Sequence, residues 1–428
     1  MGRKIQGIFV RLQHEKENMT SIVHEMGLDK SVLDRSIVNW GNVIRLKRAF
    51  REVIETGRVL KIGIMGGSVS AVNVYPRLLE KALKRILDSD VSIYNGAIGA
   101  TDSQYYAYCM RNHLDTQNLD IIIWELAVND FLKGVSPSGQ EEITRQVIEL
   151  PNKPQLLYVN FLFGKQIAKK SCNNSEDTGG RELSMYYAVP SISLSKAACR
   201  RIKAGKADDL LGGVNKNHLS SKAHLQMELF LRYFMVNVLS NVTWEILESK
   251  TSLSSEVMTE VEHVPGPLPP TYFMDTRVTK PKCWSALLPQ LGIGEYLWPI
   301  RAADGWDKVP VHSDSGDRKQ VWVGSKNGSV IRFPISIEPY ENLTSKLAIS
   351  TFTCENCGSV RAIVDNDFAR AATISGRSQH RITWPTVIAT DLEPGSHNIT
   401  IKCLSDDPFH LAAIATAYDL TTPLSIFT

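Results

Sequence analysis

The chain has 428 residues, 43% of them hydrophobic, and a formal net charge of +3 at pH 7. This length and composition suffice for two domains with apolar cores, and so mild a charge gives no indication of nucleic-acid binding. No apolar run reaches the length of a membrane span, and the charged opening Met1-Gly2-Arg3-Lys4 lacks the apolar core of a signal sequence.

Residues 1–40 are polar and mixed, and we expect them to form an extension ahead of a first domain at 41–245. An amphipathic helix that ends at Gly57 begins this domain, because a glycine commonly closes a helix. Strand-like and helix-like segments then alternate as far as a long helix that ends near Asn241. This alternation is typical of α/β domains with a parallel sheet.

One segment joins a buried strand to a helix through two glycines and a serine. Apolar residues over 59–64 predict an interior parallel strand, which stops at Gly66-Gly67-Ser68, and apolar residues then recur at helical spacing over 75–87. Glycines allow a sharp turn and the close approach of a substrate, while the helix directs its first N–H groups at the turn. Ser68 is therefore a candidate nucleophile.

Three later segments carry further groups to one edge of the predicted sheet. A second glycine turn, which contains Gly99, follows the strand at 91–94. Asn129 follows the strand at 119–126, and His218 precedes the long helix. In doubly wound sheets the functional groups gather outside the carboxyl ends of the strands, so we expect all these groups to converge.

These segments, in this order, resemble the SGNH hydrolase superfamily, also called GDSL-type esterases and lipases, over roughly residues 40–240. The matching blocks are Gly66-Gly67-Ser68, Gly96-Ala97-Ile98-Gly99, the segment from Trp124 to Asn129-Asp130, and His218 with His224. The resemblance implies a flavodoxin-like doubly wound parallel sheet. It also implies hydrolysis or transfer of an ester-linked acyl group.

Each matched residue has a role that the chemistry of ester cleavage requires. A serine hydroxyl needs a base to remove its proton, and His218 is the candidate base for Ser68. Attack on the carbonyl builds negative charge on oxygen, which fixed hydrogen-bond donors must stabilise. The backbone N–H groups of Ser68 and Gly99 and the side-chain amide of Asn129 are the predicted donors of this oxyanion hole.

The chain departs from the family pattern at Asn215, where the family carries an aspartate three residues before the histidine. An amide orients an imidazole ring without matching the charge of the imidazolium. In the serine-protease template a comparable change lowers turnover by about 10⁴. Two interpretations stay open. His218 works as a Ser–His dyad with a backbone carbonyl or another carboxylate, Asp208 or Asp209 being nearest in sequence, or the chain is a weakened or inactive hydrolase kept as a binding module.

Three other residues of these blocks have structural interpretations. His224 lies inside the predicted helix, where a packing role is expected. Asp130 is expected to cap a helix or brace a loop, and Glu125 to make a structural hydrogen bond at a strand end. No phosphate loop, HExxH motif or four-cysteine zinc pattern occurs, so we expect neither a cofactor nor a metal.

A proline-rich linker at 246–282 is predicted to lead into a second domain at 283–428. Short strands separated by turns predict an all-β sandwich or jelly roll there. The stretch from Leu392 to Lys402 resembles the closing hairpin of jelly-roll modules found beside carbohydrate esterases. Five tryptophans could include a platform for stacking sugars, although core packing is the default for each: Trp284, Trp298, Trp306, Trp322 and Trp384.

The cysteines and glycosylation sequons bear on the cellular compartment. Seven cysteines leave at least one unpaired, and we expect Cys354 and Cys357 to form a local disulfide or to stay as simple thiols. Asn-x-Ser/Thr sequons occur at Asn18, Asn173, Asn241, Asn327, Asn342 and Asn398. This excess favours a secreted glycoprotein or one of the secretory lumen.

We therefore expect a serine esterase that hydrolyses O-acyl esters, acetyl above all, on a glycan or a small ester. The alternatives are an inactive glycan- or protein-binding protein on the same fold and an O-acyltransferase that uses the same serine. The sequence does not distinguish water from a sugar hydroxyl as the acyl acceptor, and it gives no oligomeric state.

Overall fold

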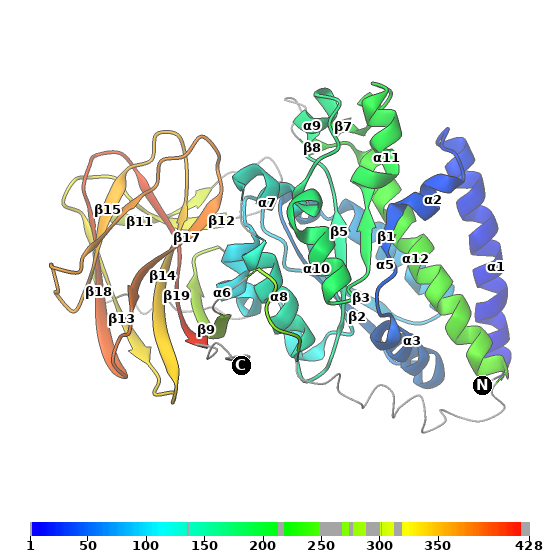
Figure 1. Ribbon diagram of the computed structural model, residues 1–428, viewed down its shortest axis with the longest axis horizontal. Coiled ribbons are helices and arrows are strands. Elements are labelled where there is room, and N and C mark those ends of the chain that lie inside the picture. The colour runs from blue at the N-terminus through cyan, green and yellow to red at the C-terminus, as the bar shows by residue number, and fades with distance from the viewer. Residues whose placement is uncertain are drawn as a thin grey trace, which may run out of the picture.

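The computed structural model describes residues 2–134, 137–212, 218–248, 268–273, 277–287, 300, 302–311 and 319–420. An α/β domain occupies the N-terminal part of the chain, and a β-sandwich follows it (Figure 1). Asn215 and Trp298, both singled out from the sequence, lie outside the described residues.

A six-stranded sheet forms the centre of the first domain, in the order β1-β6-β5-β4-β2-β3. The parallel strands are β2 (Leu60–Gly66), β3 (Val91–Asn95), β4 (Ile121–Glu125), β5 (Gln155–Asn160) and β6 (Ser191–Ser193). The edge strand β1 (Ile37–Asn39) pairs with β6 in the antiparallel direction. The parallel strands follow the flavodoxin-like order, so the predicted doubly wound sheet is confirmed.

Helices cover both faces of this sheet (Figure 1). One apolar core joins the sheet to α1 (Gly2–Glu25), α2 (Ser31–Ser36), α3 (Ile44–Thr56), α5 (Val74–Leu87), α11 (Leu194–Lys203) and α12 (Ser221–Glu248). A second core joins the other face to α6 (Ser103–His113), α8 (Ser138–Ile148) and α10 (Gly180–Tyr186). The short helices are α4 (Ser68–Ala71), α7 (Ala127–Lys133), α9 (Gly164–Ala168), η1 (Thr116–Asn118), η2 (Ser175–Thr178) and η3 (Asp208–Leu210).

Helix α1 packs against α12 through an apolar face and a buried ion pair. Ile8 and Leu12 are fully buried, at the spacing of one helical turn. The carboxylate of Glu15 pairs with Arg232 of α12 and accepts a hydrogen bond from Arg85 of α5 at 2.6 Å. Residues before position 40, expected to form an extension, thus lie on the first domain, and β1 extends its sheet.

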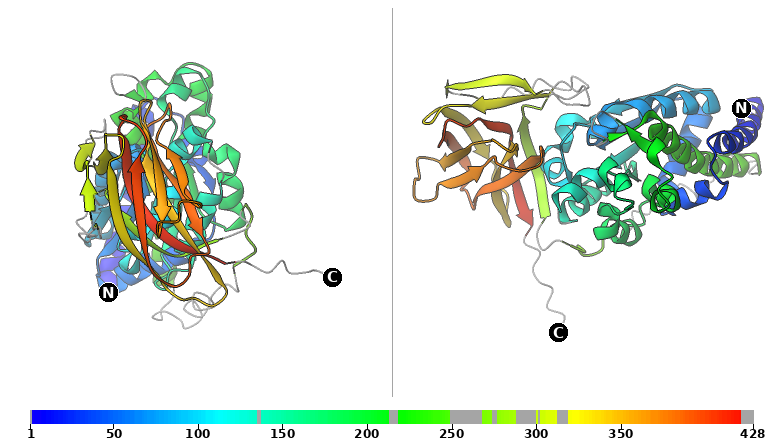
Figure 2. Two further views of the ribbon diagram at one scale, coloured as in Figure 1. Left: turned by 90° about the vertical axis from the view of Figure 1, so that its left-hand side faces the viewer. Right: turned by 90° about the horizontal axis from the view of Figure 1, so that it is seen from above.

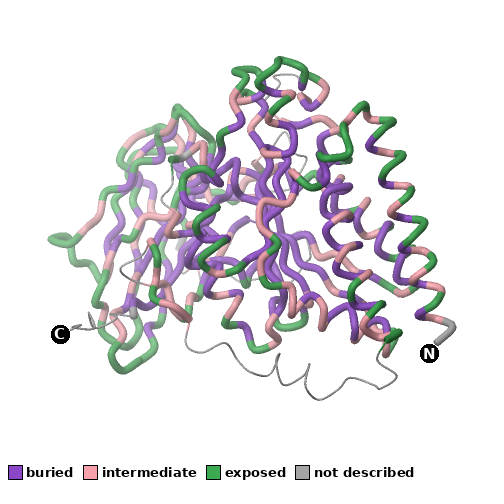
Figure 3. Tube along the Cα trace, turned by 45° about the vertical axis from the view of Figure 1, so that its right-hand side comes forward, coloured by how far each residue is buried: buried purple, intermediate pink, exposed green. Residues whose placement is uncertain are grey.

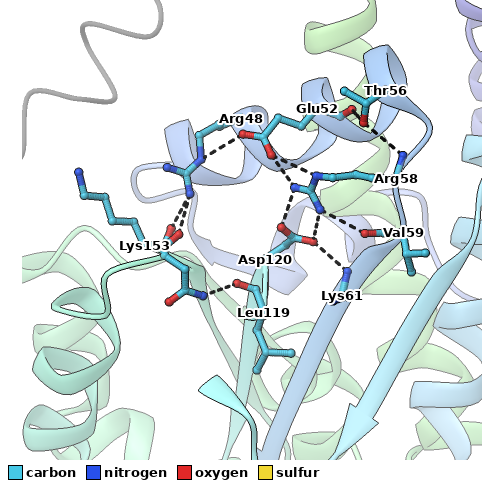
Figure 4. A network of polar contacts seen from close by, with 10 residues as sticks. Arg48, Glu52, Thr56, Arg58, Val59, Lys61, Leu119, Asp120 and Lys153 are labelled. Carbon is cyan, nitrogen blue, oxygen red and sulfur yellow. Dashed lines mark hydrogen bonds and ion pairs between the residues drawn. The ribbon is translucent and has the colours of Figure 1, made fainter. Parts of the chain in front are cut away.

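A charged cluster lies at the amino ends of β2 and β4 (Figure 4). The guanidinium of Arg58 binds both carboxylate oxygens of Asp120, at 2.7 and 2.8 Å, and also Glu52. Asp120 also accepts the backbone N–H of Lys61 at 2.9 Å. Because Asp120 precedes β4 and Lys61 lies in β2, these bonds tie two neighbouring strands together at their beginnings.

The second domain is a sandwich of two antiparallel sheets, which confirms the predicted all-β fold. One sheet has the order β10-β13-β18-β15-β16, and the other β11-β12-β19-β14-β17, with β9 also paired to β19. The strands are β9 (Arg277–Ser285), β10 (Ala302–Asp304), β11 (Trp306–Val311), β12 (Lys319–Gly324), β13 (Val330–Ile337), β14 (Leu343–Phe352), β15 (Ser359–Val364), β16 (Ala372–Ser375), β17 (Thr383–Thr390), β18 (Gly395–Cys403) and β19 (Phe409–Leu420). A two-stranded ribbon of β7 (Leu211–Gly212) and β8 (His218–Leu219) belongs to the first domain.

The two domains share one apolar core between α6 and the strands β9 and β19. Figure 2 shows the sandwich lying directly against the α/β domain, and Figure 3 shows buried residues in both domains. A disulfide joins Cys109 of α6 to Cys283 of β9. Asn112 donates a hydrogen bond to the carbonyl oxygen of Cys283 at 2.9 Å, and the hydroxyls of Tyr105 and Ser285 lie 2.8 Å apart. The sandwich is therefore fixed to the α/β domain covalently as well as by packing.

Two further disulfides join Cys172 to Cys199 and Cys354 to Cys357, while Cys403 is a buried free thiol. The predicted unpaired cysteine and the local Cys354–Cys357 disulfide are both confirmed. Among the described residues, no helix is both long enough and apolar enough to span a bilayer.

Candidate active site

Ser68 begins α4, directly after the glycine turn at the carboxyl end of β2, which lies between β4 and β3 in the sheet. The turn is tightly packed, because a Cβ atom on Gly66 would lie 2.7 Å from the hydroxyl of Ser70 and one on Gly67 would lie 2.6 Å from the amide nitrogen of Asn129. Both positions thus require glycine. The strand, glycine turn and helix expected around the serine are all present.

His218 lies directly beside this serine. Its Nε2 atom is 3.2 Å from the Oγ atom of Ser68, although the two residues are 150 positions apart in the chain. His218 begins β8, which pairs with β7 and leads into α12. The ring is therefore held on a short ribbon with its Nε2 within hydrogen-bond reach of the hydroxyl, which is the geometry that a general base needs.

The predicted oxyanion donors surround the same turn. Asn129, near the start of α7, is buried and packs its amide on Gly67. The amide donates a hydrogen bond to the carbonyl oxygen of Thr101, which uses one of its two N–H groups. Gly99 lies in the loop between β3 and α6, one residue after Ile98, whose N–H donates to the carbonyl oxygen of Gly66 at 3.0 Å. The loop that carries Gly99 is thus bound to the nucleophile strand.

The β-sandwich also contacts this loop. The backbone N–H of Thr383 donates to the carbonyl oxygen of Ala100 at 2.6 Å. Ala100 adopts a left-handed conformation, with φ of 61°, which turns the chain sharply after Gly99. Beside Thr383, the ring of Trp384 is 39% exposed, whereas Trp306 is buried in the sandwich core.

His224 lies behind the site in a mainly apolar environment. Its ring stacks on Tyr75, with centroids 6.2 Å apart, and packs against Phe161 at 5.7 Å. Burial lowers the pKa of His224 to about 4, and the proximity of His218 adds to this effect. The expected packing role agrees with these contacts.

Neither carboxylate suggested as a partner for His218 binds it in the described part of the chain. Asp209 is engaged by Arg201 and by Lys222, each at 2.7 Å. Asp208 is exposed. In the described structure, neither residue therefore supplies a carboxylate partner for His218.

Asp130 and Glu125 both have the structural contacts expected of them. Asp130 accepts the backbone N–H of Ser103 at 2.9 Å, near the start of α6, and so braces that helix beside the loop with Gly99. Glu125 accepts the hydroxyl of Ser70 at 2.9 Å. The sequence did not indicate that Glu125 lies beneath the serine turn, because strand-end position alone does not show which loop will cover a side chain.

One group with metal-ligand chemistry occurs among the described residues, formed by Cys354, Cys357 and His410. The Sγ atom of Cys357 is 3.4 Å from Nδ1 of His410. Both cysteines are already joined as a disulfide, so the group does not offer thiolate ligands in this state.

The fold and the site together define a two-domain chain in which a serine–histidine pair lies at the carboxyl edge of a flavodoxin-like sheet. No protein-family model matches the sequence, and no curated protein sequence matches it. Among solved structures, the chain is similar to a two-domain esterase, CEX, that is active on acetylated mannans, with 19% identity over 90% of this chain and 98% of that one and a TM-score of 0.62. The same esterase co-crystallised with mannopentaose matches equally, with 97% of its chain covered. At this level of identity the likeness shows only that the two chains share the same two-domain fold.

Proposed function

We propose that this protein is a serine esterase that removes O-acyl groups, acetyl above all, from a glycan. The observation that carries the proposal is the 3.2 Å approach of His218 Nε2 to Ser68 Oγ at the carboxyl edge of the sheet. The shared fold with an esterase active on acetylated mannans supports a carbohydrate ester as the substrate. The resemblance to SGNH hydrolases supports the serine mechanism.

In the proposed reaction His218 takes the hydroxyl proton of Ser68 while the Oγ atom attacks the ester carbonyl. The carbonyl oxygen becomes an oxyanion, which the N–H groups of Ser68, Gly99 and Asn129 stabilise. The imidazolium then gives its proton to the departing sugar oxygen, leaving Ser68 acylated. Water, deprotonated by His218, attacks the acyl carbon and releases the carboxylic acid, and the proton returns to the serine.

The three disulfides favour an oxidising compartment, and the six sequons agree with this. These features support the proposal that the protein acts outside the cell or in the secretory lumen.

One specific observation favours a binding protein instead. Asn215 replaces the acid that the family pattern carries before its histidine. A glycan-binding protein on the same fold would also tolerate this replacement, so activity has to be measured directly.

The test combines acetate release from acetylated mannan with labelling by a fluorophosphonate, which reacts with activated serines. The wild-type protein is expected to release acetate and to be labelled. Ser68→Ala is expected to do neither, whereas Ser92→Ala, on the neighbouring strand β3, should match the wild type. Labelling that persists in Ser68→Ala would remove this serine from the mechanism.

A further inference from the structure

A buried carboxyl group lies directly beneath the turn that carries Ser68. Glu125 is the last residue of β4, pairs in register with Gly66 of β2, and is almost fully buried. Its side chain accepts the hydroxyl of Ser70 at 2.9 Å, and its carbonyl oxygen accepts the N–H of Gly67 at 3.1 Å. Glu125 thus contacts Gly67, directly before Ser68, and Ser70, two residues after it.

The hydrogen bonds continue from Glu125 toward the histidine side of the site. The hydroxyl of Ser70 lies 2.8 Å from the phenolic oxygen of Tyr75, and the ring of Tyr75 stacks on His224. The carbonyl oxygen of Ser70 accepts the side-chain amide of Asn95 at 2.8 Å. Ser70 is therefore held on three sides, and its position depends on the carboxyl group.

None of the groups that most strongly affect the pKa of the Glu125 carboxyl group is a cation, so no nearby positive charge stabilises its ionised form among them. Burial raises the pKa of Glu125 to about 8, while hydrogen bonds from the Ser70 hydroxyl and from the N–H groups of Gly67 and Ser70 oppose the rise. Asp130, from α7, adds a further upward contribution to this pKa. Two further titratable groups that interact with it in the described structure are Tyr75 of α5 and Tyr106 of α6, whose own pKa values are raised mainly by burial.

We propose that Glu125 is a positioning residue for Ser68 and that its neutral form is the active one. The inference rests on the proposed esterase function. A neutral carboxyl group keeps the serine turn in place without adding charge, whereas a carboxylate would lie under Gly67, against which the Asn129 amide packs. That buried negative charge would oppose the oxyanion that forms beside it, since charges interact strongly in a site of low polarity.

The sign of the pH effect follows from the raised pKa. Below about 8 the carboxyl group is neutral and turnover is unaffected by it. As the pH rises through this value, the active fraction falls by about tenfold for each further pH unit. A glutamine has the shape of the neutral acid and does not ionise, so Glu125→Gln should lose this alkaline decline.

The experiment measures turnover and the rate of fluorophosphonate labelling from pH 6 to 10 for the wild type, Glu125→Gln and a matched control. Glu176→Gln is the control, because Glu176 is also a buried glutamate bonded to a serine, Ser193, and burial raises its pKa to about 7. We expect the decline in the wild type and in Glu176→Gln, and a flat profile in Glu125→Gln at about the wild-type plateau. A decline that survives in Glu125→Gln would overturn the inference.

A second variant covers the case in which Glu125→Gln does not fold. Ser70→Ala removes a hydrogen bond that favours the ionised carboxyl group, so the decline should move to higher pH. A decline that stays in place or moves to lower pH would contradict the inference. If the wild-type protein neither hydrolyses esters nor is labelled at any pH, the proposed function is wrong together with this inference. If labelling requires Ser68 but has the same pH dependence in Glu125→Gln as in the wild type, this inference alone is wrong.

Discussion

Thr383 of the β-sandwich binds Ala100 of the α/β domain through a backbone hydrogen bond of 2.6 Å. Ala100 is the residue directly after Gly99, whose N–H is a proposed oxyanion donor. The second domain therefore holds one of the loops that form the candidate site. It is expected to affect turnover as well as substrate binding.

Replacing Thr383 by proline removes the N–H that makes this bond. We expect Thr383→Pro to lower kcat by about 10²-fold, because a small displacement of a catalytic donor has an effect of this size. Thr383→Ser keeps the N–H and should retain nearly full activity. Comparing kcat and thermal unfolding for both variants checks the prediction, and an active Thr383→Pro protein would show that the contact is not needed.

His218 and His224 are expected to respond differently to substitution. His218→Ala should lower kcat by about 10⁴-fold or more, since it removes the base next to Ser68. His224→Phe keeps a ring against Tyr75 and Phe161 and should lower kcat by less than about tenfold. Steady-state kinetics on an aryl acetate distinguishes the two, and a larger loss in His224→Phe would reverse the assignment of the base.

Asn215 offers a test of the missing acid. We expect Asn215→Asp to raise turnover by about tenfold to a hundredfold, because a carboxylate would offset the imidazolium charge that an amide cannot. Asp209→Asn serves as the control and should change turnover little, since Asp209 binds Arg201 and Lys222. A fall in turnover on introducing the aspartate would show that the amide itself is required.

Because His113 and His224 are buried, we expect the free energy of unfolding to fall in acid. Burial lowers the pKa of His113 from 6.5 to about 3 and that of His224 from 6.5 to about 4. Between about pH 6.5 and 4 the unfolded chain binds protons that the folded chain does not, so stability falls as the pH falls through this range. Each histidine contributes a slope of about 1.4 kcal/mol per pH unit at most.

Urea unfolding at several pH values measures this slope. His224→Phe removes one of the two groups and should make the dependence between pH 6.5 and 4 clearly shallower. His14→Gln, at an exposed position of α1, is the control and should leave the dependence unchanged. An equal slope in wild type and His224→Phe would contradict the prediction.

The sheet was predictable because it depends on local patterns, and the approach of His218 to Ser68 was predictable because the order of the sequence blocks resembles that of SGNH hydrolases. Buried runs that end in glycine turns predict parallel strands, and the carboxyl ends of such strands meet at one edge. These strand ends account for the position of Ser68, whereas His218 lies on the β7–β8 ribbon outside the sheet, where strand patterns alone would not have placed it.

Contacts between distant segments were not predictable in this way. The pair of Cys354 and Cys357 follows from their closeness in the chain, but no pattern links Cys109 to Cys283, which are 174 residues apart. The bond from Thr383 to Ala100 joins two backbone groups, which every residue carries, so no residue type marks it. Only the folded arrangement brings these groups together.

The disulfide between Cys109 of α6 and Cys283 of β9 joins two residues that lie on either side of the chain segment between α12 and β9. A protease that cut the chain once in that segment would leave two polypeptides still linked through sulfur. Such a nicked protein should run as one species on a denaturing gel without reductant and as two with it. The two domains of a nicked chain would therefore separate only after a reductant had cleaved this disulfide.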